Sequence, residues 1–360
     1  MPISVMLKPS SSLCNLKCKY CFYSSLSSER EEYSKGFMNL ETAESIIKSA
    51  VDYTKGTEII FTFQGGEPML SGIDFYKSFT ELVKKHNTYK SKITYCLQTN
   101  GTLMNEEWCV FFKENNFLIG VSLDGNESQN QYRVYPNGSS SFEDVVNGIE
   151  MLKKYGVQFN VLSVVTKQLA NSVRDNYKFM KKNQIYNFQY INCLKPFDEA
   201  SDKDLYMNNE DYSAFLEKAF RLYYNDNRMG GSVSVRSFDN YLLLLRGNYA
   251  EQCGMNGFCS TQFVVEGDGT VYPCDFYCTD EWELGNINHF SFSEMHKSKK
   301  AKGFIEESFA IDEQCQGCSY FALCRGGGCK RSRQDTNFCN AYKKFFSSSL
   351  NMMKDLNRII

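Results

Sequence analysis

"SSLCNLKCKYCFY", residues 11–23, follows a strand-like run at residues 3–8 and carries three cysteines in a C-x3-C-x2-C pattern. The three thiolates, from Cys14, Cys18 and Cys21, are one ligand short of a closed tetrahedral zinc site. They are sufficient for a four-iron cluster that leaves one iron open to another ligand. On spacing alone, an incomplete zinc loop or three unrelated thiols remain alternatives.

The composition favours thiolate metal sites over disulfides. The 360 residues include 15 cysteines but only three histidines, so mixed Cys/His zinc sites are disfavoured, and zinc or iron–sulfur sites made of thiolates alone remain. The first residues, MPISVMLKPS, lack the features of a secretory signal, and we expect a cytoplasmic protein in which disulfides do not persist. A net charge of −2, with no basic tract and no long apolar run, predicts neither nucleic acid nor a membrane as a partner.

Short β-rich runs alternate with amphipathic helical stretches over the first 195 residues. One helix is expected at residues 40–55, with Asn39 as its N-cap and Gly56 at its end. Six strand–helix units in succession imply parallel strands joined by right-handed crossovers. This pattern predicts an α/β fold, a partial (β/α)6 barrel, with functional residues at the carboxyl ends of the strands. The expected strands lie at residues 3–8, 58–63, 92–97, 117–123, 157–165 and 186–191.

The alternation stops near residue 230, and ligand-spaced cysteines interleaved with glycine follow. We expect the barrel at residues 1–230, a small metal-stapled domain at 231–345 and a C-terminal helix at 346–360. A structural zinc ribbon is the serious alternative for this region, because CQGC at 315–318 would suit one. The eight cysteines concerned are Cys253, Cys259, Cys274, Cys315, Cys318, Cys324, Cys329 and Cys339.

The motif CNLKCKYC, residues 14–21, resembles that of the radical S-adenosylmethionine (SAM) superfamily. Three further segments stand where that fold needs them, at the ends of expected strands: FQGGEP (63–68), LQTNGT (97–102) and VSLDG (121–125). The resemblance implies a [4Fe–4S] cluster whose open iron binds the amino and carboxylate groups of SAM. Reductive cleavage then releases a 5′-deoxyadenosyl radical, and the protein supplies position and exclusion of water.

The segment FQGGEP is the first expected part of the SAM site. Gly65 and Gly66 allow the backbone to approach a ligand closely, and Glu67 can accept a hydrogen bond from an ammonium group. In the family this segment holds the methionine amino group. The alternative is a strand-ending turn with a solvated glutamate.

Other residues complete the SAM contacts that the resemblance implies. Ser122 and Asp124 match positions that approach the ribose and the methionine carboxylate or shape the substrate pocket, although turn chemistry would also explain them. Arg133 could pair with the cofactor carboxylate or be a surface charge. Cys193 and Leu194, just past the sixth expected strand, could line the adenine pocket, although packing in the core would also explain them.

The order of the eight later cysteines resembles the SPASM extension of radical enzymes that modify peptides, which implies two auxiliary [4Fe–4S] clusters and three clusters in all. One departure is the four residues RGGG between the cysteines at 324 and 329, where the family usually has three; glycine could absorb the extra residue as a bulge. Cys278 is the alternative ligand for Cys329. The resemblance assigns Cys253, Cys259, Cys274 and Cys329 to the first auxiliary cluster, and Cys315, Cys318, Cys324 and Cys339 to the second.

Within this family the chain resembles the anaerobic sulfatase-maturating enzymes, through CGMNGFC (253–259), FVVEGDGTVYPCDFY (263–277) and LGNI (284–287). These enzymes oxidise a cysteine or serine of a sulfatase, in the motif Cys/Ser-x-Pro-x-Arg, to Cα-formylglycine. The resemblance implies a sulfatase polypeptide as substrate and a reducing electron donor such as flavodoxin or ferredoxin. We expect a monomer.

Asp275, next to the expected ligand Cys274, is the candidate base for the proton that the substrate thiol or hydroxyl must lose. A hydrogen bond that organises the cluster is the alternative role for this carboxylate. Tyr23, Gln64 and Arg236 are candidate contacts for the peptide substrate, although each would also suit the rim of a site.

Three other functions remain open. The nearest is a radical peptide maturase that forms thioether or carbon cross-links; such enzymes usually carry a leader-binding domain ahead of the first cysteine motif, whereas here Cys14 comes almost at once. A non-catalytic metal scaffold would leave the GGE segment without a purpose. A radical enzyme acting on a small molecule is disfavoured by the SPASM-like region.

Overall fold

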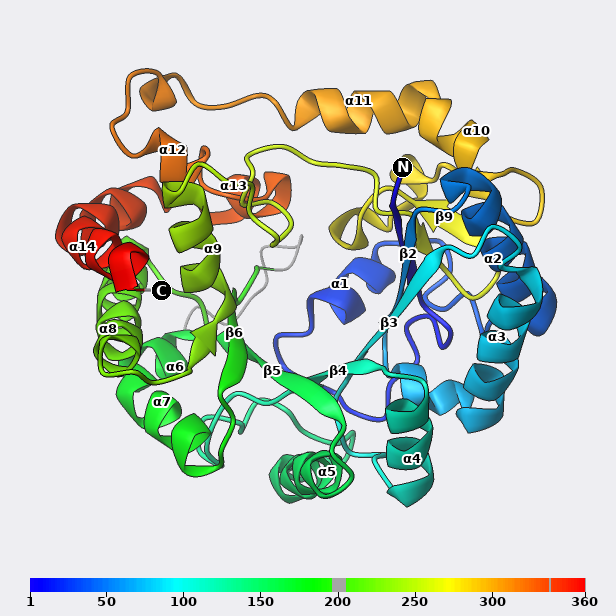
Figure 1. Ribbon diagram of the computed structural model, residues 1–360, viewed down its shortest axis with the longest axis horizontal. Helices are drawn as coiled ribbons and strands as arrows, with labels where there is room; N and C mark the ends of the chain where they lie inside the picture. The colour runs from blue at the N-terminus through cyan, green and yellow to red at the C-terminus, as the bar shows by residue number, and fades with distance from the viewer. Residues whose placement is uncertain (196–204, 337, 360) are drawn as a thin grey trace. The chain divides into compact units, whose positions relative to one another are not determined.

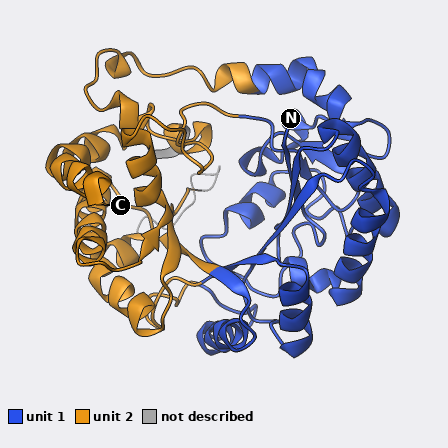
Figure 2. Ribbon diagram, in the orientation of Figure 1, with its two compact units in different colours: residues 1–122, 133–159, 260–304 blue, residues 123–132, 160–259, 305–360 orange. Residues whose placement is uncertain are grey.

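The computed structural model describes residues 1–195, 205–336 and 338–359, without the side chains of 334–336, and the chain forms two compact units (Figure 2). Unit 1 comprises residues 1–122, 133–159 and 260–304; unit 2 comprises residues 123–132, 160–259 and 305–360. The domain boundaries predicted at residues 230 and 345 stay predictions. No helix among the described residues is both long and apolar enough to cross a membrane.

Unit 1 is built on a mixed sheet with the strand order β10-β9-β8-β1-β2-β3-β4. Strands β1 to β4 are parallel, β8 is parallel to β1, and β9 and β10 are antiparallel to their neighbours. Leu7 pairs with both Phe63 and Val265, so the residues that follow these three strands leave the sheet at the same edge. The strands are β1 (Ile3–Leu7), β2 (Glu58–Phe63), β3 (Lys92–Thr99), β4 (Leu118–Ser122), β8 (Val264–Val265), β9 (Thr270–Tyr272) and β10 (Gly285–Asn286).

Helices α2, α3 and α4 lie on one face of these strands, and α1 lies on the other (Figure 1). Aromatic side chains fill the space between β2 and α3: Phe63 contacts Tyr76 and Phe79 edge to face, with ring centroids 4.9 and 5.1 Å apart. The helical segments are α1 (Phe22–Ser28), α2 (Leu40–Thr54), η1 (Pro68–Ser71), α3 (Ile73–His86), α4 (Glu106–Glu114), α5 (Phe142–Lys154), η2 (Asp275–Tyr277), η3 (Asp280–Trp282), α10 (Phe292–Lys297) and α11 (Lys299–Glu307), the last of which ends in unit 2.

The helix predicted at residues 40–55 is confirmed as α2. The side chain of Asn39 accepts a hydrogen bond from the Thr42 backbone N–H at 2.8 Å, as expected of an N-cap. The helix ends at Thr54 because Lys55 adopts the left-handed conformation, with φ of 48°, and Gly56 follows with φ of 100°.

Unit 2 has the parallel strand order β5-β6-β7, covered by helices. The long helices α8 and α14 pack against each other, and Phe345 of α14 contacts Phe220 of α8 with ring centroids 5.6 Å apart. The elements are β5 (Gln158–Val165), which starts in unit 1, α6 (Lys167–Asn171), α7 (Val173–Lys182), β6 (Asn187–Asn192), α8 (Asn209–Arg228), β7 (Ser234–Val235), α9 (Arg236–Leu245), η4 (Glu313–Cys315), α12 (Phe321–Cys324), α13 (Lys330–Thr336) and α14 (Cys339–Ile359).

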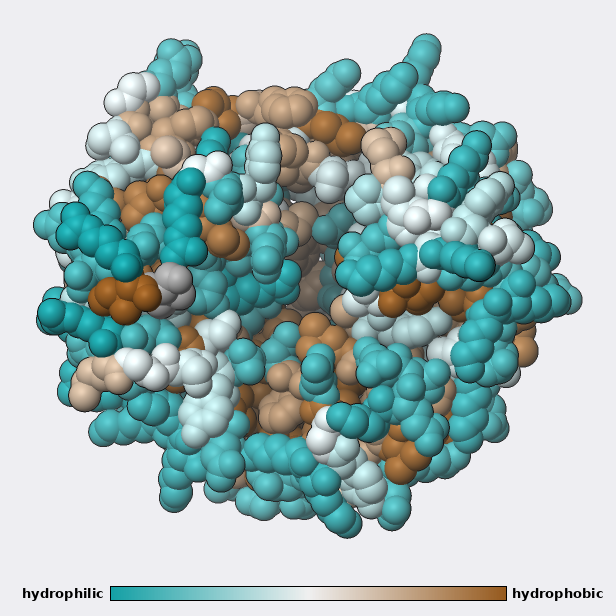
Figure 3. Space-filling model, in the orientation of Figure 1, coloured by the Kyte–Doolittle hydropathy of each residue, from teal (hydrophilic) through white to brown (hydrophobic). Residues whose placement is uncertain are grey.

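The α/β fold predicted from the sequence is confirmed. All six expected barrel strands are present, each within two residues of its predicted ends, and the cysteine-rich region and a C-terminal helix follow them. The face of the molecule seen in Figure 3 is largely hydrophilic, with hydrophobic side chains in scattered groups.

Two glycines inside helices of this fold differ in their surroundings. A Cβ at Gly148 of α5 would lie 2.3 Å from the carbonyl oxygen of Gly101, whereas a Cβ at Gly303 of α11 would meet nothing within 4 Å. Alanine favours a helix over glycine by about 1 kcal/mol, but overpacking costs about 1 to 3 kcal/mol. We therefore expect Gly148→Ala to lower the free energy of unfolding in urea and Gly303→Ala to raise it. Equal effects of the two substitutions would contradict this packing.

Candidate functional site

The cysteine loop packs directly on the GGE segment. The backbone N–H groups of Gly66 and Glu67 donate to the carbonyl oxygens of Ser11 and Leu13, both at 2.8 Å. A Cβ at Gly66 would lie 2.0 Å from the Leu13 oxygen, and Gly65 has φ of 133°. Both glycines are therefore required for the contact between the two segments, and their predicted contact with SAM stays a prediction.

The thiols of the loop have donors of their own. Backbone N–H groups of Leu16 and Ser24 point at the sulfurs of Cys14 and Cys21, each at 3.4 Å. Although Cys14 as a whole residue is exposed, desolvation of its sulfur, and beyond that the nearby Glu67, Cys18 and Cys21, raises the pKa of this thiol to about 12. Three cysteine thiols in one short loop are the ligand type that holds iron–sulfur clusters, so the donor set fits an iron cluster.

Glu67 is fully buried and already engaged within the chain. One carboxylate oxygen accepts from the backbone N–H of Met69 at 3.1 Å and the Thr99 hydroxyl at 2.8 Å, and the other accepts from the Asn100 backbone N–H at 2.7 Å. Burial raises the pKa of Glu67 to about 7, and the hydrogen bonds counteract part of that rise. The carboxylate therefore ties the end of β2 to the end of β3, and it is not the solvated turn residue of the alternative interpretation.

Ser122 and Asp124 both have partners inside their own units. The Ser122 hydroxyl accepts from the Gln98 amide at 2.9 Å in unit 1. In unit 2 the buried carboxylate of Asp124 accepts from the Val164 backbone N–H at 2.8 Å. Part of the role of each side chain is thus to fix the chain locally, as the turn-chemistry alternative requires.

Arg133 and Leu194 are buried, and Arg236 is exposed. Arg133 retains 6% of its accessible surface, and its guanidinium lies 5.4 Å from the ring centroid of Tyr20. It is therefore not the surface charge of the alternative interpretation. Arg236 lies near Gln189, with 3.5 Å between the side-chain nitrogen and oxygen.

Asp275 stands between a cation and an amide donor. One carboxylate oxygen is 2.5 Å from the Lys8 ammonium nitrogen, and the other accepts from the Gln64 amide at 2.8 Å. Burial lowers the pKa of Lys8, but Asp275, Cys278 and Glu266 together outweigh burial and raise it, so Lys8 stays charged. Lys8 and Gln64 follow β1 and β2 directly, which is why they meet at one edge of the sheet.

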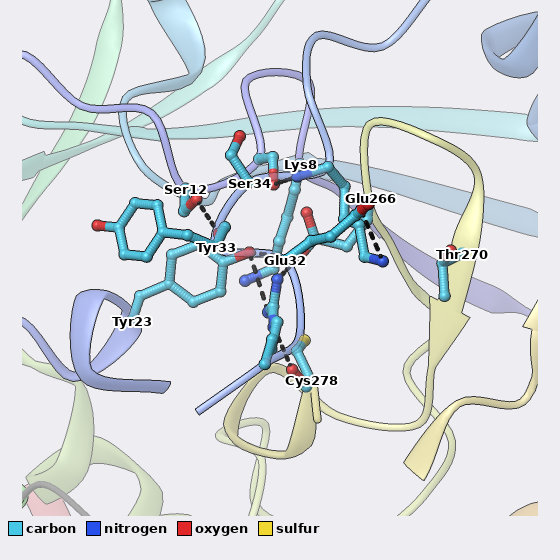
Figure 4. Close-up of polar contacts among 12 residues, drawn as sticks. Lys8, Ser12, Tyr23, Glu32, Tyr33, Ser34, Glu266, Thr270 and Cys278 are labelled. Atoms are coloured by element: carbon cyan, nitrogen blue, oxygen red, sulfur yellow. Dashed lines mark hydrogen bonds and ion pairs between the residues drawn. The ribbon is translucent and has the colours of Figure 1, made fainter. Parts of the chain in front are cut away.

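A second buried ion pair lies beside the first. Arg30 and Glu266 are 3.0 Å apart through Nη1 and Oε1, and the Tyr23 hydroxyl donates to the same glutamate oxygen. The Lys8 ammonium lies 3.3 Å from the Tyr23 ring centroid. Figure 4 shows Lys8, Tyr23, Glu266 and Cys278 turned toward one another. Tyr23 is thus buried, with 3% of its surface accessible, rather than at a rim.

Sequence reasoning missed Lys8, Arg30 and Glu266. A usable signal was present for two of them, because Lys8 and Glu266 are charged residues directly after apolar strands of the same sheet. Arg30 follows α1 and carried no comparable signal.

The cysteines assigned to the first auxiliary cluster belong to both units: Cys274 lies in unit 1 and the others in unit 2. Within unit 2, a Cβ at Gly254 would lie 2.8 Å from the Cβ of Cys329, so the turn after Cys253 is packed on that cysteine. The glycines at 326–328 all have positive φ, between 81° and 93°, as a bulge in RGGG requires. Cys278 is fully buried, and its sulfur donates to the Cys274 carbonyl oxygen at 3.5 Å.

The cysteines assigned to the second auxiliary cluster all line one pocket in unit 2. Aromatic side chains form much of its wall, and Lys343 contributes a positive charge. Four thiols around a mostly apolar cavity fit an iron–sulfur cluster. Among the described residues, no group of three or more His, Cys, Asp or Glu is arranged to hold a single metal ion. The lining residues are Gln314, Cys315, Cys318, Tyr320, Phe321, Cys324, Gly326, Cys339, Tyr342, Lys343 and Phe346.

We expect Glu67→Gln to lower the free energy of unfolding by about 2 kcal/mol, because either orientation of the amide sets its NH2 group against a backbone N–H. Urea denaturation measures the loss. Glu58→Gln, at the start of β2 and paired with Lys92 at the surface, is the control and should leave stability nearly unchanged. A Glu67→Gln protein as stable as this control would contradict the role given to the carboxylate.

Replacing Cys324 by alanine should remove about four iron atoms per chain from anaerobically reconstituted protein. Cys278→Ala is the matched control and should retain them, since the buried Cys278 sulfur donates to the Cys274 carbonyl oxygen. Iron and sulfide analysis measures both. Loss of iron from Cys278→Ala would instead identify Cys278 as a ligand.

The chain matches two family models and known proteins along its length. The model described as the Radical SAM superfamily matches residues 9–180, and that described as the SPASM iron–sulfur cluster-binding domain matches residues 253–319. The cysteine-type anaerobic sulfatase-maturating enzyme of Clostridium novyi (strain NT) is 43% identical over 98% of this chain and 96% of its own length.

Solved structures agree with the sequence comparison. Native anSMEcpe with bound AdoMet, which is SAM, has a TM-score of 0.95 and 41% identity, with 100% of both chains covered. The structure of native anSMEcpe with bound AdoMet and the Cp18Cys peptide has a TM-score of 0.94 and 40% identity, again with 100% of both chains covered. This chain therefore belongs to the anaerobic sulfatase-maturating enzymes of the radical SAM superfamily, and it is a radical SAM oxidoreductase with an iron–sulfur cluster-binding SPASM domain.

Proposed function

We propose that this enzyme oxidises the Cβ of a cysteine in a sulfatase polypeptide to the aldehyde of Cα-formylglycine. The observation that carries the proposal is the 43% identity, over almost the whole chain, to an enzyme described as cysteine-type and sulfatase-maturating. Because that relative is cysteine-type, we propose cysteine rather than serine as the preferred target. The recognised motif would be Cys-x-Pro-x-Arg.

The first cluster would be held by Cys14, Cys18 and Cys21, and SAM would lie at the ends of the barrel strands. The N–H groups at the loop sulfurs support the cluster assignment. We propose that the backbone of the GGE segment holds the methionine amino group, since the Glu67 carboxylate is occupied within the chain. The other proposed SAM contacts are Ser122, Asp124, Arg133 and Leu194.

The two auxiliary clusters would take the cysteines assigned from the SPASM resemblance. The shared cavity of Cys315, Cys318, Cys324 and Cys339 supports the second cluster. The packing of Gly254 on Cys329 supports Cys329 in the first. When bound, SAM supplies the 5′-deoxyadenosyl radical that removes a hydrogen atom from Cβ, and the auxiliary clusters can take up an electron.

Asp275 would accept the thiol proton as the carbon–sulfur double bond forms. The change from Cβ–SH to thioaldehyde removes one hydrogen atom, one proton and one electron; water then replaces sulfur and releases hydrogen sulfide. A carboxylate has about four lone-pair sites, and Lys8 and Gln64 occupy one each, so acceptor capacity remains. The charge of Lys8 offsets that of the buried carboxylate, and the Gln64 amide fixes its plane.

Gln64 and Arg236 remain proposed peptide contacts, whereas we assign Tyr23 to the ion-pair network because its hydroxyl donates to Glu266. A low-potential donor such as flavodoxin or ferredoxin would supply electrons. We further propose a monomer that works in the cytosol, where thiol-ligated clusters persist.

The defining experiment uses anaerobically reconstituted enzyme with SAM, a strong reductant and a synthetic peptide carrying Cys-x-Pro-x-Arg. Mass spectrometry follows 5′-deoxyadenosine and hydrazide-trapped aldehyde together. We expect both products, and less aldehyde from the matched serine peptide. Deoxyadenosine without aldehyde from either peptide would overturn the sulfatase assignment.

Asp275→Asn should retain SAM cleavage while lowering aldehyde formation by about a hundredfold or more, because an amide does not accept the proton. Asp280→Asn, five residues later, is the control and should behave as the parent enzyme. The two products are quantified in the same reaction. An unchanged aldehyde yield in Asp275→Asn would remove Asp275 as the base.

A further inference from the structure

Arg30 is a buried cation that the proposed chemistry leaves without a task. It retains 6% of its accessible surface, and its ion-pair partner Glu266 retains none. Burying two charges is expensive, and replacement by apolar residues is often neutral for stability. The presence of this pair beside the candidate base therefore calls for a specific role.

The contacts of Arg30 divide between two supports of Asp275. Its Nε donates to the Cys278 carbonyl oxygen at 2.5 Å. Cys278 closes the short helix η2, and Asp275 is the first residue of η2. Arg30 thus holds the far end of the three-residue turn that carries the carboxylate.

The second support runs through Tyr23. Nη2 of Arg30 lies 3.3 Å from the Tyr23 hydroxyl, which donates to Glu266. The Lys8 ammonium lies over the ring of Tyr23, in a cation–π contact, and Lys8 is ion-paired with Asp275. Arg30 therefore reaches the carboxylate both through the backbone of its turn and through its counter-ion.

We infer that Arg30, fixed by Glu266, is a positioning residue for the Asp275 carboxylate. The inference rests on the proposed function, in which Asp275 takes the substrate proton. Proton transfer needs the base at hydrogen-bond distance from the thiol, and a misplacement of about 1 Å costs about a hundredfold. Displacing the turn should therefore impair aldehyde formation and leave the earlier cleavage of SAM intact.

Two variants separate positioning from folding. Arg30→Lys keeps the charge opposite Glu266, but one ammonium cannot reproduce the fork that contacts Glu266, the Cys278 carbonyl and the Tyr23 hydroxyl together. The double variant Arg30→Met/Glu266→Leu removes both charges, so no unpaired charge is left buried. Lys35→Met is the matched control, because Lys35 pairs with Glu32 and Asp268 nearby and does not contact Arg30 or Asp275.

The readout is the aldehyde formed per 5′-deoxyadenosine, with iron content, melting temperature and peptide KM measured alongside. A fraction of unfolded enzyme leaves this ratio unchanged, whereas a displaced base lowers it. We expect both Arg30 variants to lower the ratio about tenfold or more, with iron and KM close to the parent values. Lys35→Met should keep the parental ratio.

A parental ratio in the double variant would overturn the inference and leave Arg30 with a structural role alone. Loss of iron or of folding in both Arg30 variants would overturn it as well, as would an equal drop in Lys35→Met. These outcomes leave the proposed function in place. Failure of the parent enzyme to form aldehyde would overturn the proposed function, and this inference with it.

Discussion

The buried ion pair between Lys8 and Asp275 joins two segments that lie 267 residues apart in the chain. It exists because β8 pairs in parallel with β1, which brings the end of the first strand beside the segment that carries Cys274 and Asp275. A barrel strand and the SPASM region therefore share one sheet in unit 1. The position of the proposed base depends on that pairing more than on any local feature of its own turn.

Around this pair the interior of unit 1 is charged and yet balanced. Lys8 and Arg30 supply two positive charges, and Asp275 and Glu266 supply two negative ones, all with at most 6% of their surface accessible. Tyr23 contacts both pairs, Lys8 through its ring and Glu266 through its hydroxyl. A neutral set of this kind avoids the cost of an uncompensated buried charge, while it keeps polar groups in fixed directions where a proton must be accepted.

Much of the fold could be read from the sequence, because β-rich runs and the helix at 40–55 follow local periodicity and capping. The cysteine groups were equally readable, since their spacing is set by cluster chemistry. No local sequence pattern indicates the pairing of β8 with β1, because β8 has only two residues. Lys8 and Glu266 were missed because a charged residue after a strand normally indicates solvent, and only the pairing of β8 with β1 buries them. Arg30, which follows α1, is buried by its long-range contacts with Glu266 and Cys278. Arg133 was equally ambiguous until its burial against Tyr20 was seen.

The long separation between β1 and β8 has a consequence for synthesis of the chain. A ribosome-bound chain that has not reached residue 264 has β1 with an unpaired edge on the side that β8 will occupy. Open strand edges invite pairing with other chains, and contacts of such long range form late and slowly. The network around Asp275 therefore assembles only after most of the chain has been made. Truncated products would carry the first cysteine motif without the base, and with an edge exposed to aggregation.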